Sequence, residues 1–226
     1  NGMRRVSAPF MIVFAITVTF ASFDWLMSLD VHWFSSIFGI YVFSGMVLSG
    51  LAAITIAVVI LKWNGYLGDI ITNNHLYNLG GLLFAFVCFW GYIAFSQFML
   101  IWYGNLPEEA AFFVNRVNGK WQIVTVLLII VRFVIPFILL ISRFSKMNST
   151  ILFITSVIIL TGEFIDVYWL IMPQIFKEKP IFGLLEAGPS VLMTGIFILW
   201  IFHFIKKYSM IVRNDPKFEQ SRNFHL

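Results

Sequence analysis

Long apolar stretches alternate with short polar segments along almost the whole chain. A helix needs roughly 20 apolar residues to cross the hydrocarbon core of a bilayer. We place spans of that length at about 7–28, 37–61, 79–103, 121–142, 150–172 and 189–208, followed by a polar tail over 209–226. Tryptophan, tyrosine and lysine mark several ends of these spans, as they do at membrane interfaces. The pattern predicts an all-α, polytopic membrane protein with about six transmembrane helices.

The composition agrees with this prediction. Hydrophobic residues make up 60% of the chain and charged residues 12%, against about 25% charged residues in soluble domains. The net charge of +4 comes from basic residues in the short loops and the tail, so it does not indicate a nucleic-acid partner. Cys88 is the single cysteine, which excludes a disulfide framework and a cysteine-ligated iron–sulfur cluster. We expect this chain to bind no metal and no redox cofactor of its own.

The basic residues outside the spans divide unequally between the two sides of the membrane. One side has ten, namely Arg4, Arg5, Lys62, Arg143, Lys146, Lys206, Lys207, Arg213, Lys217 and Arg222. The other side has four, namely Arg116, Lys120, Lys177 and Lys179. Cytoplasmic segments carry the excess of Lys and Arg, so we expect both ends of this segment to be cytoplasmic.

Four ionisable residues lie within the predicted spans, where a charge costs at least a few kcal/mol and is a functional candidate by default. They are Asp24, Arg132, Glu163 and Asp166. Glu163 and Asp166 are three residues apart and therefore share one helix face. A short loop joins the fourth and fifth spans, so Arg132 is expected to reach Glu163, leaving Asp166 and Asp24 less well compensated. The four residues are candidates for a proton path, or alternatively a paired network that holds the bundle together.

Pro136 follows Arg132 by four residues in the fourth span. A proline lacks the N–H that would bond the Arg132 carbonyl in an α-helix. We therefore expect a kink beside Arg132, and such breaks in spans usually line protein interior or a cavity.

Further polar and aromatic residues lie near the outer ends of the first and third spans. Asp30 and His32 fall in a short outer loop and are expected to form a capped turn or a partner contact. Gln97 and Trp102 belong to an aromatic-rich span, in which stacked rings form either a quinone pocket or ordinary packing. The segment "NLPEEAAFF" is suited to the start of a short helix.

Two stretches carry a resemblance to a known family. "FDWLMSLDVHWFSSIFGIYVFSG" (23–45) and "SQFMLIWYGNLPEE" (96–109) resemble the NrfD-like, or polysulfide-reductase-like, integral membrane subunits of bacterial alternative complex III, most closely the F subunit. The chain departs from the expected pattern at Val31, where proline is expected. Family members have about ten spans, so the resemblance implies that this chain corresponds to the C-terminal part.

The resemblance implies a function as well. Alternative complex III is a quinol:cytochrome c oxidoreductase of the bacterial inner membrane that oxidises menaquinol. Its iron–sulfur clusters and c-type haems lie on partner subunits, and electrons leave to a cytochrome c or a terminal oxidase. The F-like subunit carries no redox cofactor and serves as scaffold and proton path, while its paralogue is the better-supported quinol-binding subunit. The implied partners are that paralogue, an iron–sulfur subunit and multihaem and monohaem cytochromes c; menaquinone remains a possible ligand of this chain.

Two alternatives stay open at the level of sequence. One is a secondary transporter in which Arg132 binds an anionic solute at a helix break, although no internal repeat is visible here. The other is a cofactor-free helper subunit of a terminal oxidase. Co-purifying haems and iron–sulfur protein would favour the complex, whereas stabilisation by a solute would favour the transporter.

Overall fold

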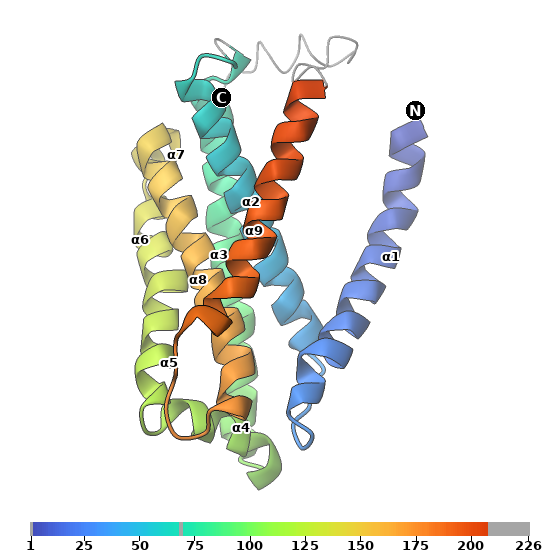
Figure 1. The fold of residues 1–226 in the computed structure, drawn as a ribbon, viewed down its shortest axis with the longest axis vertical. Coiled ribbons are helices and arrows are strands. Elements are labelled where there is room, and N and C mark those ends of the chain that lie inside the picture. Colours follow the sequence, from blue (N-terminus) through green and yellow to red (C-terminus); the bar gives the residue numbers. More distant parts are fainter. Residues whose placement is uncertain (1, 68–69, 208–226) are drawn as a thin grey trace.

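The computed structural model describes residues 2–67 and 70–207, and in these ranges it contains helices and no strand (Figure 1). The predicted tail over 209–226 lies outside the described residues. Six helical segments are long and apolar enough to cross a membrane. The structure therefore confirms an all-α, polytopic membrane protein. The long helices are α1 (Gly2–Trp25), α2 (Phe38–Trp63), α3 (Asn73–Gly104), α8 (Ser149–Ile175) and α9 (Leu184–Lys207), with α5 (Trp121–Ile129), the π-helical turn η3 (Ile130–Val134) and α6 (Ile135–Ile141) forming the sixth.

Short helices complete the described chain. The 3₁₀ turn η1 (Met27–Leu29) follows α1, α4 (Pro107–Val117) connects α3 to α5, and α7 (Arg143–Met147) connects α6 to α8. As the sequence predicted, "NLPEEAAFF" begins a helix, with Pro107 in the first turn of α4. Proline suits that position because its missing N–H has no helical partner there.

Polar residues start two of the long helices. Asn148 accepts hydrogen bonds at Oδ1 from the backbone N–H groups of Thr150 and Ile151, which caps α8. Thr72 and His75 form a capping box at the start of α3. For this reason α3 begins at Asn73, one to two turns before the apolar stretch predicted at 79.

The core of the molecule is a bundle of α2, α3, the α5–η3–α6 segment and α8. Helix α2 lies against both α3 and α8, and η3 and α6 lie against α8 (Figure 1). The side chains between these helices are fully buried and mostly aliphatic, among them Leu48, Ala52, Leu83, Val87 and Leu152. Close packing of this kind holds helices together in a membrane, where lipid offers no hydrophobic driving force.

Helices α1 and α9 are little buried by the rest of the described chain, and α1 splays away from the bundle toward its N-terminal end (Figure 1). The end of α1 approaches α2 so closely that a Cβ atom on Gly39 would lie 2.7 Å from Cγ2 of Thr19. Helix α9 buries none of its residues within the described chain. Both helices expose large apolar side chains, including Phe10, Ile12, Leu192 and Trp200.

The fourth span is distorted where the sequence predicted a kink. The form of the distortion is a π-helical turn, in which the backbone N–H of Ile135 donates to the carbonyl of Ile130, five residues earlier. Pro136 lies in the first turn of the helix that follows. The wider turn accommodates the missing N–H of Pro136 and carries Arg132. Turns of this type are frequent at functional sites.

Candidate functional site

Arg132 lies at the centre of a charged cluster inside the bundle. Its Nη2 is 2.6 Å from Oε2 of Glu163, and its Nη1 is 3.0 Å from Oδ2 of Asp166. Both acids project from one face of α8, as their spacing predicted. Arg132 is fully buried and Asp166 is 3% exposed, whereas the Glu163 side chain is 27% exposed. One guanidinium therefore contacts one deeply buried carboxylate and one partly accessible carboxylate.

Helix α2 supplies the polar groups that complete the cluster. The hydroxyl of Tyr41 donates to Oδ1 of Asp166, and the hydroxyl of Ser49 lies 2.5 Å from Oε2 of Glu163, to which it donates. Asp166 thus has the cation at one carboxylate oxygen and a hydroxyl at the other, whereas both partners of Glu163 contact Oε2. Pairing of this kind offsets part of the cost of taking charges out of water.

Helix α3 covers the cluster with Trp90. The guanidinium carbon of Arg132 lies 4.6 Å from the ring centroid of Trp90, within range of a cation–π interaction. The indole N–H of Trp90 lies near Asp166 without forming a hydrogen bond to it. The Nε of Arg132 has no hydrogen-bond partner among the described residues either.

Two glycines make room for the guanidinium and its backbone. A Cβ atom on Gly45 would lie 2.6 Å from Nη2 of Arg132, and one on Gly162 would lie 3.0 Å from the Arg132 Cα. Real Cβ atoms do not approach at the first of these distances. The packing of α2 and α8 around Arg132 therefore depends on glycine at Gly45, and an added methyl group at Gly162 would also press on η3.

The charges of the cluster do not balance when all three groups are ionised. One cation faces two carboxylates, so the formal sum is +1 − 2 = −1. A single added proton would make the cluster neutral, and a neutral cluster costs less in a low-dielectric interior. The arrangement is chemically suited to bind and release one proton, and Glu163 is the member with access to the surface.

The structure confirms one sequence prediction about this cluster and corrects two others. Arg132 does reach Glu163. The expectation that Asp166 stays less well compensated is wrong, because Arg132 pairs with both acids. The expectation that Asp24 joins these acids is also wrong, because Asp24 lies exposed in the last turn of α1 and makes no ion pair with any described residue.

The structure also places the other candidate residues from the sequence, two in the loop after α1 and two on α3. Asp30 accepts a 2.6 Å hydrogen bond from Nε2 of Gln174, which ties the loop after α1 to the end of α8. His32 is exposed. Trp102 is 71% exposed and points away from the bundle interior, whereas Gln97 is only 5% exposed. Gln97 lines an aromatic cavity within the described bundle.

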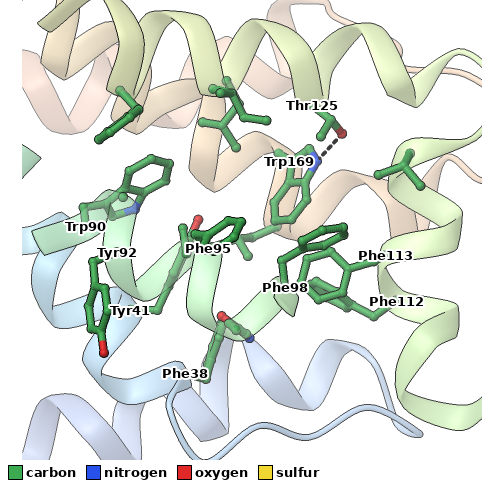
Figure 2. Close-up of a pocket in the computed structure, with 18 of the residues that line it drawn as sticks. Phe38, Tyr41, Trp90, Tyr92, Phe95, Phe98, Phe112, Phe113, Thr125 and Trp169 are labelled. Atoms are coloured by element: carbon green, nitrogen blue, oxygen red, sulfur yellow. Dashed lines mark hydrogen bonds between the residues drawn. The ribbon is translucent and has the colours of Figure 1, made fainter. Parts of the chain in front are cut away.

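That cavity has a volume of about 620 Å³ and lies between α3, α4, α5 and the ends of α2 and α8 (Figure 2). Its walls are mainly aromatic, including Tyr41, Trp90, Phe95, Phe113 and Trp169. The volume falls within the range of small-molecule sites, about 300–1,000 Å³. Tyr41 and Trp90 belong both to this wall and to the charged cluster, so the cavity and the cluster are adjacent.

Arg116 is a second buried cation, and the sequence prediction missed it by treating it as an outer-loop residue. It is fully buried in α4. Its Nε lies 3.2 Å from the carbonyl oxygen of Trp169 and its Nη2 lies 3.0 Å from that of Leu170, and its guanidinium carbon stacks 3.4 Å from the centroid of Phe112. Burial lowers the pKa of this guanidinium to about 9, partly opposed by the nearby carboxylate of Asp30, so the group stays charged at neutral pH.

A sequence signal for this role exists in Pro173. Proline at 173 removes the N–H that would bond the Trp169 carbonyl in α8. Arg116 supplies the missing donor to that carbonyl. A proline inside a helix therefore indicates an acceptor four residues earlier that needs a partner from elsewhere in the fold.

Comparison with known proteins does not identify a family. No protein-family model matches the chain, and no curated protein matches it significantly. Among residues 2–67 and 70–207, no group of three His, Cys, Asp or Glu side chains is placed to hold a metal ion. The resemblance to alternative complex III stays a prediction.

Proposed function

We propose that this chain is an integral membrane subunit of a respiratory quinol:cytochrome c oxidoreductase of the alternative complex III type, in the inner membrane of a bacterium. In this proposal it is a scaffold for its partner subunits and conducts protons through the Arg132 cluster, with both ends of the segment cytoplasmic. The observation that carries the proton role is the buried pairing of one guanidinium with two carboxylates. Menaquinol oxidation, haem c and iron–sulfur clusters are assigned to the partner subunits.

The positions of the two acids support a proton path that leads from the partly accessible Glu163 to the buried Asp166. Glu163 is partly accessible and Asp166 is enclosed, and they lie one helical turn apart on α8. A proton arriving at Glu163 can pass to Asp166 through rearrangement of their shared partner, Arg132. Tyr41, hydrogen-bonded to Asp166, extends the series to the wall of the aromatic cavity. Helices α1 and α9, with their exposed apolar faces, support the scaffold role because they offer contact area to other membrane subunits.

The transporter alternative is less well supported. An anionic solute would need an accessible cation, whereas Arg132 is fully buried and both of its terminal nitrogens are already paired with carboxylates. The helix break beside Arg132 is a π turn within a continuous span, without an unwound segment. No observation favours the terminal-oxidase helper over the proposed complex.

The proposal is tested with the assembled complex reconstituted in vesicles. The double variant Glu163→Gln and Asp166→Asn keeps the size and hydrogen-bonding shape of both side chains and removes their protonation. We expect normal assembly, continued quinol oxidation and a lower number of protons moved per electron. The matched control is Glu108→Gln with Glu109→Gln, an exposed and a half-buried acid at the start of α4, away from the Arg132 cluster, which should leave the stoichiometry unchanged.

Two results would reject the proton role. Unchanged stoichiometry in the double variant removes the Arg132 cluster from any proton path. The double variant could also assemble poorly while the fraction that does assemble moves the normal number of protons per electron. That result would assign the cluster to the structural network instead.

A further inference from the structure

The aromatic cavity is lined by a buried side-chain amide, that of Gln97, which has no hydrogen-bond partner among the described residues. Gln97 lines the cavity and is 5% exposed. Its side-chain amide makes no hydrogen bond to any residue within the described ranges. The amide is accessible from a cavity whose wall is mainly apolar and has no protein partner there, so its position indicates a ligand that hydrogen-bonds to it.

The rest of the wall defines the shape and polarity of that ligand. Flat aromatic rings from several helices line the space, among them Phe95, Phe98, Phe113 and Trp169 (Figure 2). Aromatic walls suit a planar ring by stacking. The indole N–H of Trp169 is not available to a ligand, because it donates to Oγ1 of Thr125 at 2.8 Å (Figure 2). The Tyr41 hydroxyl donates to Asp166, and the indole N–H of Trp90 lies near the same carboxylate. The amide of Gln97 lies apart from that cluster and can orient a carbonyl or hydroxyl oxygen of the ligand.

The cavity can be reached from the bilayer. Tyr92 and Phe95 line it and are also 66% and 62% exposed on the surface of α3. Because α3 is one of the membrane spans, this surface faces lipid or a neighbouring membrane subunit. A ligand with a long apolar tail could leave that tail between Tyr92 and Phe95 and insert only its ring.

We propose that this cavity binds the ring of a membrane-soluble quinone or quinol, with the Gln97 amide hydrogen-bonded to a ring oxygen. A phospholipid acyl chain would fill the volume but leave the amide without a partner. The choice of a quinone among ring-bearing lipids rests on the proposed function. The cavity and its unpaired amide are features of the structure and do not depend on that function. The site is distinct from the quinol-oxidising site that the proposal assigns to the paralogous subunit.

A photoaffinity experiment on the whole complex tests this site. The probe is a naphthoquinone with an azide on the ring and a short prenyl tail, added to the complex in phosphatidylcholine nanodiscs. We expect crosslinks in α3 and α4 of this chain, detected by peptide mapping and displaced by excess menaquinone. Mapping separates them from crosslinks on the paralogous subunit.

Three variants sharpen the result. Gln97→Leu removes the amide with little change in volume and should reduce the crosslink yield in α3 and α4 about tenfold, the loss expected for one hydrogen bond. Ala94→Phe fills the cavity and should abolish the crosslinks. The matched control is Gln122→Leu, an exposed glutamine on α5, which should label as the wild type does.

The labelling results distinguish a quinone site from a site for a lipid chain. Equal labelling in Gln97→Leu, or crosslinks displaced by phosphatidylethanolamine but not by menaquinone, overturns the proposal in favour of a lipid chain. If Gln97→Leu does not assemble, unchanged labelling in Ala94→Phe overturns it. Proton stoichiometry is measured without the probe, so failure of the quinone site and failure of the proton role are distinguishable.

Discussion

A Cβ atom on Gly45 would lie 2.6 Å from Nη2 of Arg132, so the absence of a side chain on α2 determines where the buried guanidinium lies. The same virtual Cβ would lie 3.4 Å from both carboxylate oxygens of Glu163, an ordinary contact distance. A methyl group at this position therefore pushes against the cation first. The ion pair cannot move freely, since Arg132 is also in contact with Asp166.

Gly45→Ala should destabilise the protein although alanine is the better helix former. We expect a loss of about 1–3 kcal/mol from overpacking, measured as a lower thermal midpoint of the purified protein in detergent. Gly50→Ala on the same helix is the matched control, because its Cβ would meet nothing within 4 Å. That variant should be neutral or slightly stabilising, by up to about 1 kcal/mol. Equal midpoints for the two variants would contradict the packing described here.

The ion pairs themselves give a second prediction. Arg132→Met keeps the length of the side chain but leaves two carboxylates without their cation. Removing one partner of a buried pair costs about 3–5 kcal/mol, so we expect a large fall in the thermal midpoint. Neutralising the acids as well, with Glu163→Gln and Asp166→Asn, should recover most of the loss.

The recovery in this triple variant distinguishes charge from packing. A methionine that merely packs badly would remain destabilising after the acids are neutralised. A midpoint that stays at the Arg132→Met value would therefore contradict the electrostatic explanation. The cycle compares the wild type, Arg132→Met, the double acid variant and the triple variant. Their unfolding free energies, measured in one detergent and at one pH, give the coupling energy between the cation and the acids.

The cluster was partly predictable from sequence. The spacing of Glu163 and Asp166 indicated one helix face, and the short connection between the fourth and fifth spans brought Arg132 beside them. Tyr41 and Ser49 were not predictable, because α2 is apolar on nearly all sides and its sequence does not show which side faces α8. The exposed position of Asp24 was missed for a related reason. A membrane helix can place an acid toward lipid headgroups or toward protein, and only the angle between α1 and the bundle distinguishes the two.

Arg116 was misassigned because its sequence neighbourhood is that of a loop. The count of basic residues treated it as solvated, yet α4 folds back and buries it against α8. The fold class needed only the lengths of the apolar stretches, so it followed from sequence with little ambiguity. The partners of buried polar groups depend on tertiary packing, and the sequence alone did not supply it.

The pairing of Arg116 with the carbonyl left free by Pro173 leads to a third prediction. Arg116→Met should cost about 3 kcal/mol, as expected for hydrogen bonds from a charged donor to buried acceptors. Pro173→Ala restores a helical N–H for the Trp169 carbonyl. In that background Arg116→Met should cost clearly less, so the two substitutions should be coupled in a double-mutant cycle of thermal or denaturant unfolding. Purely additive effects would show that the carbonyl does not depend on Arg116.

Thr125 links two buried groups and gives the last prediction. Its Oγ1 lies 2.6 Å from the carbonyl oxygen of Arg116, to which it donates, and it accepts the indole N–H of Trp169 at 2.8 Å (Figure 2). Thr125→Val has nearly the same shape but leaves both groups without this partner. We expect a loss of about 1–3 kcal/mol, seen in the thermal midpoint together with a shift in the tryptophan emission spectrum.

Thr161→Val on α8 is the matched control for this change. Its hydroxyl bonds only the carbonyl of Val157 on its own helix and is exposed. A substitution of this kind is usually within about 0.5 kcal/mol of neutral. If Thr125→Val is as mild as Thr161→Val and leaves the emission unchanged, the Trp169 N–H must have another acceptor. The orientation of the indole along the cavity wall would then not depend on Thr125.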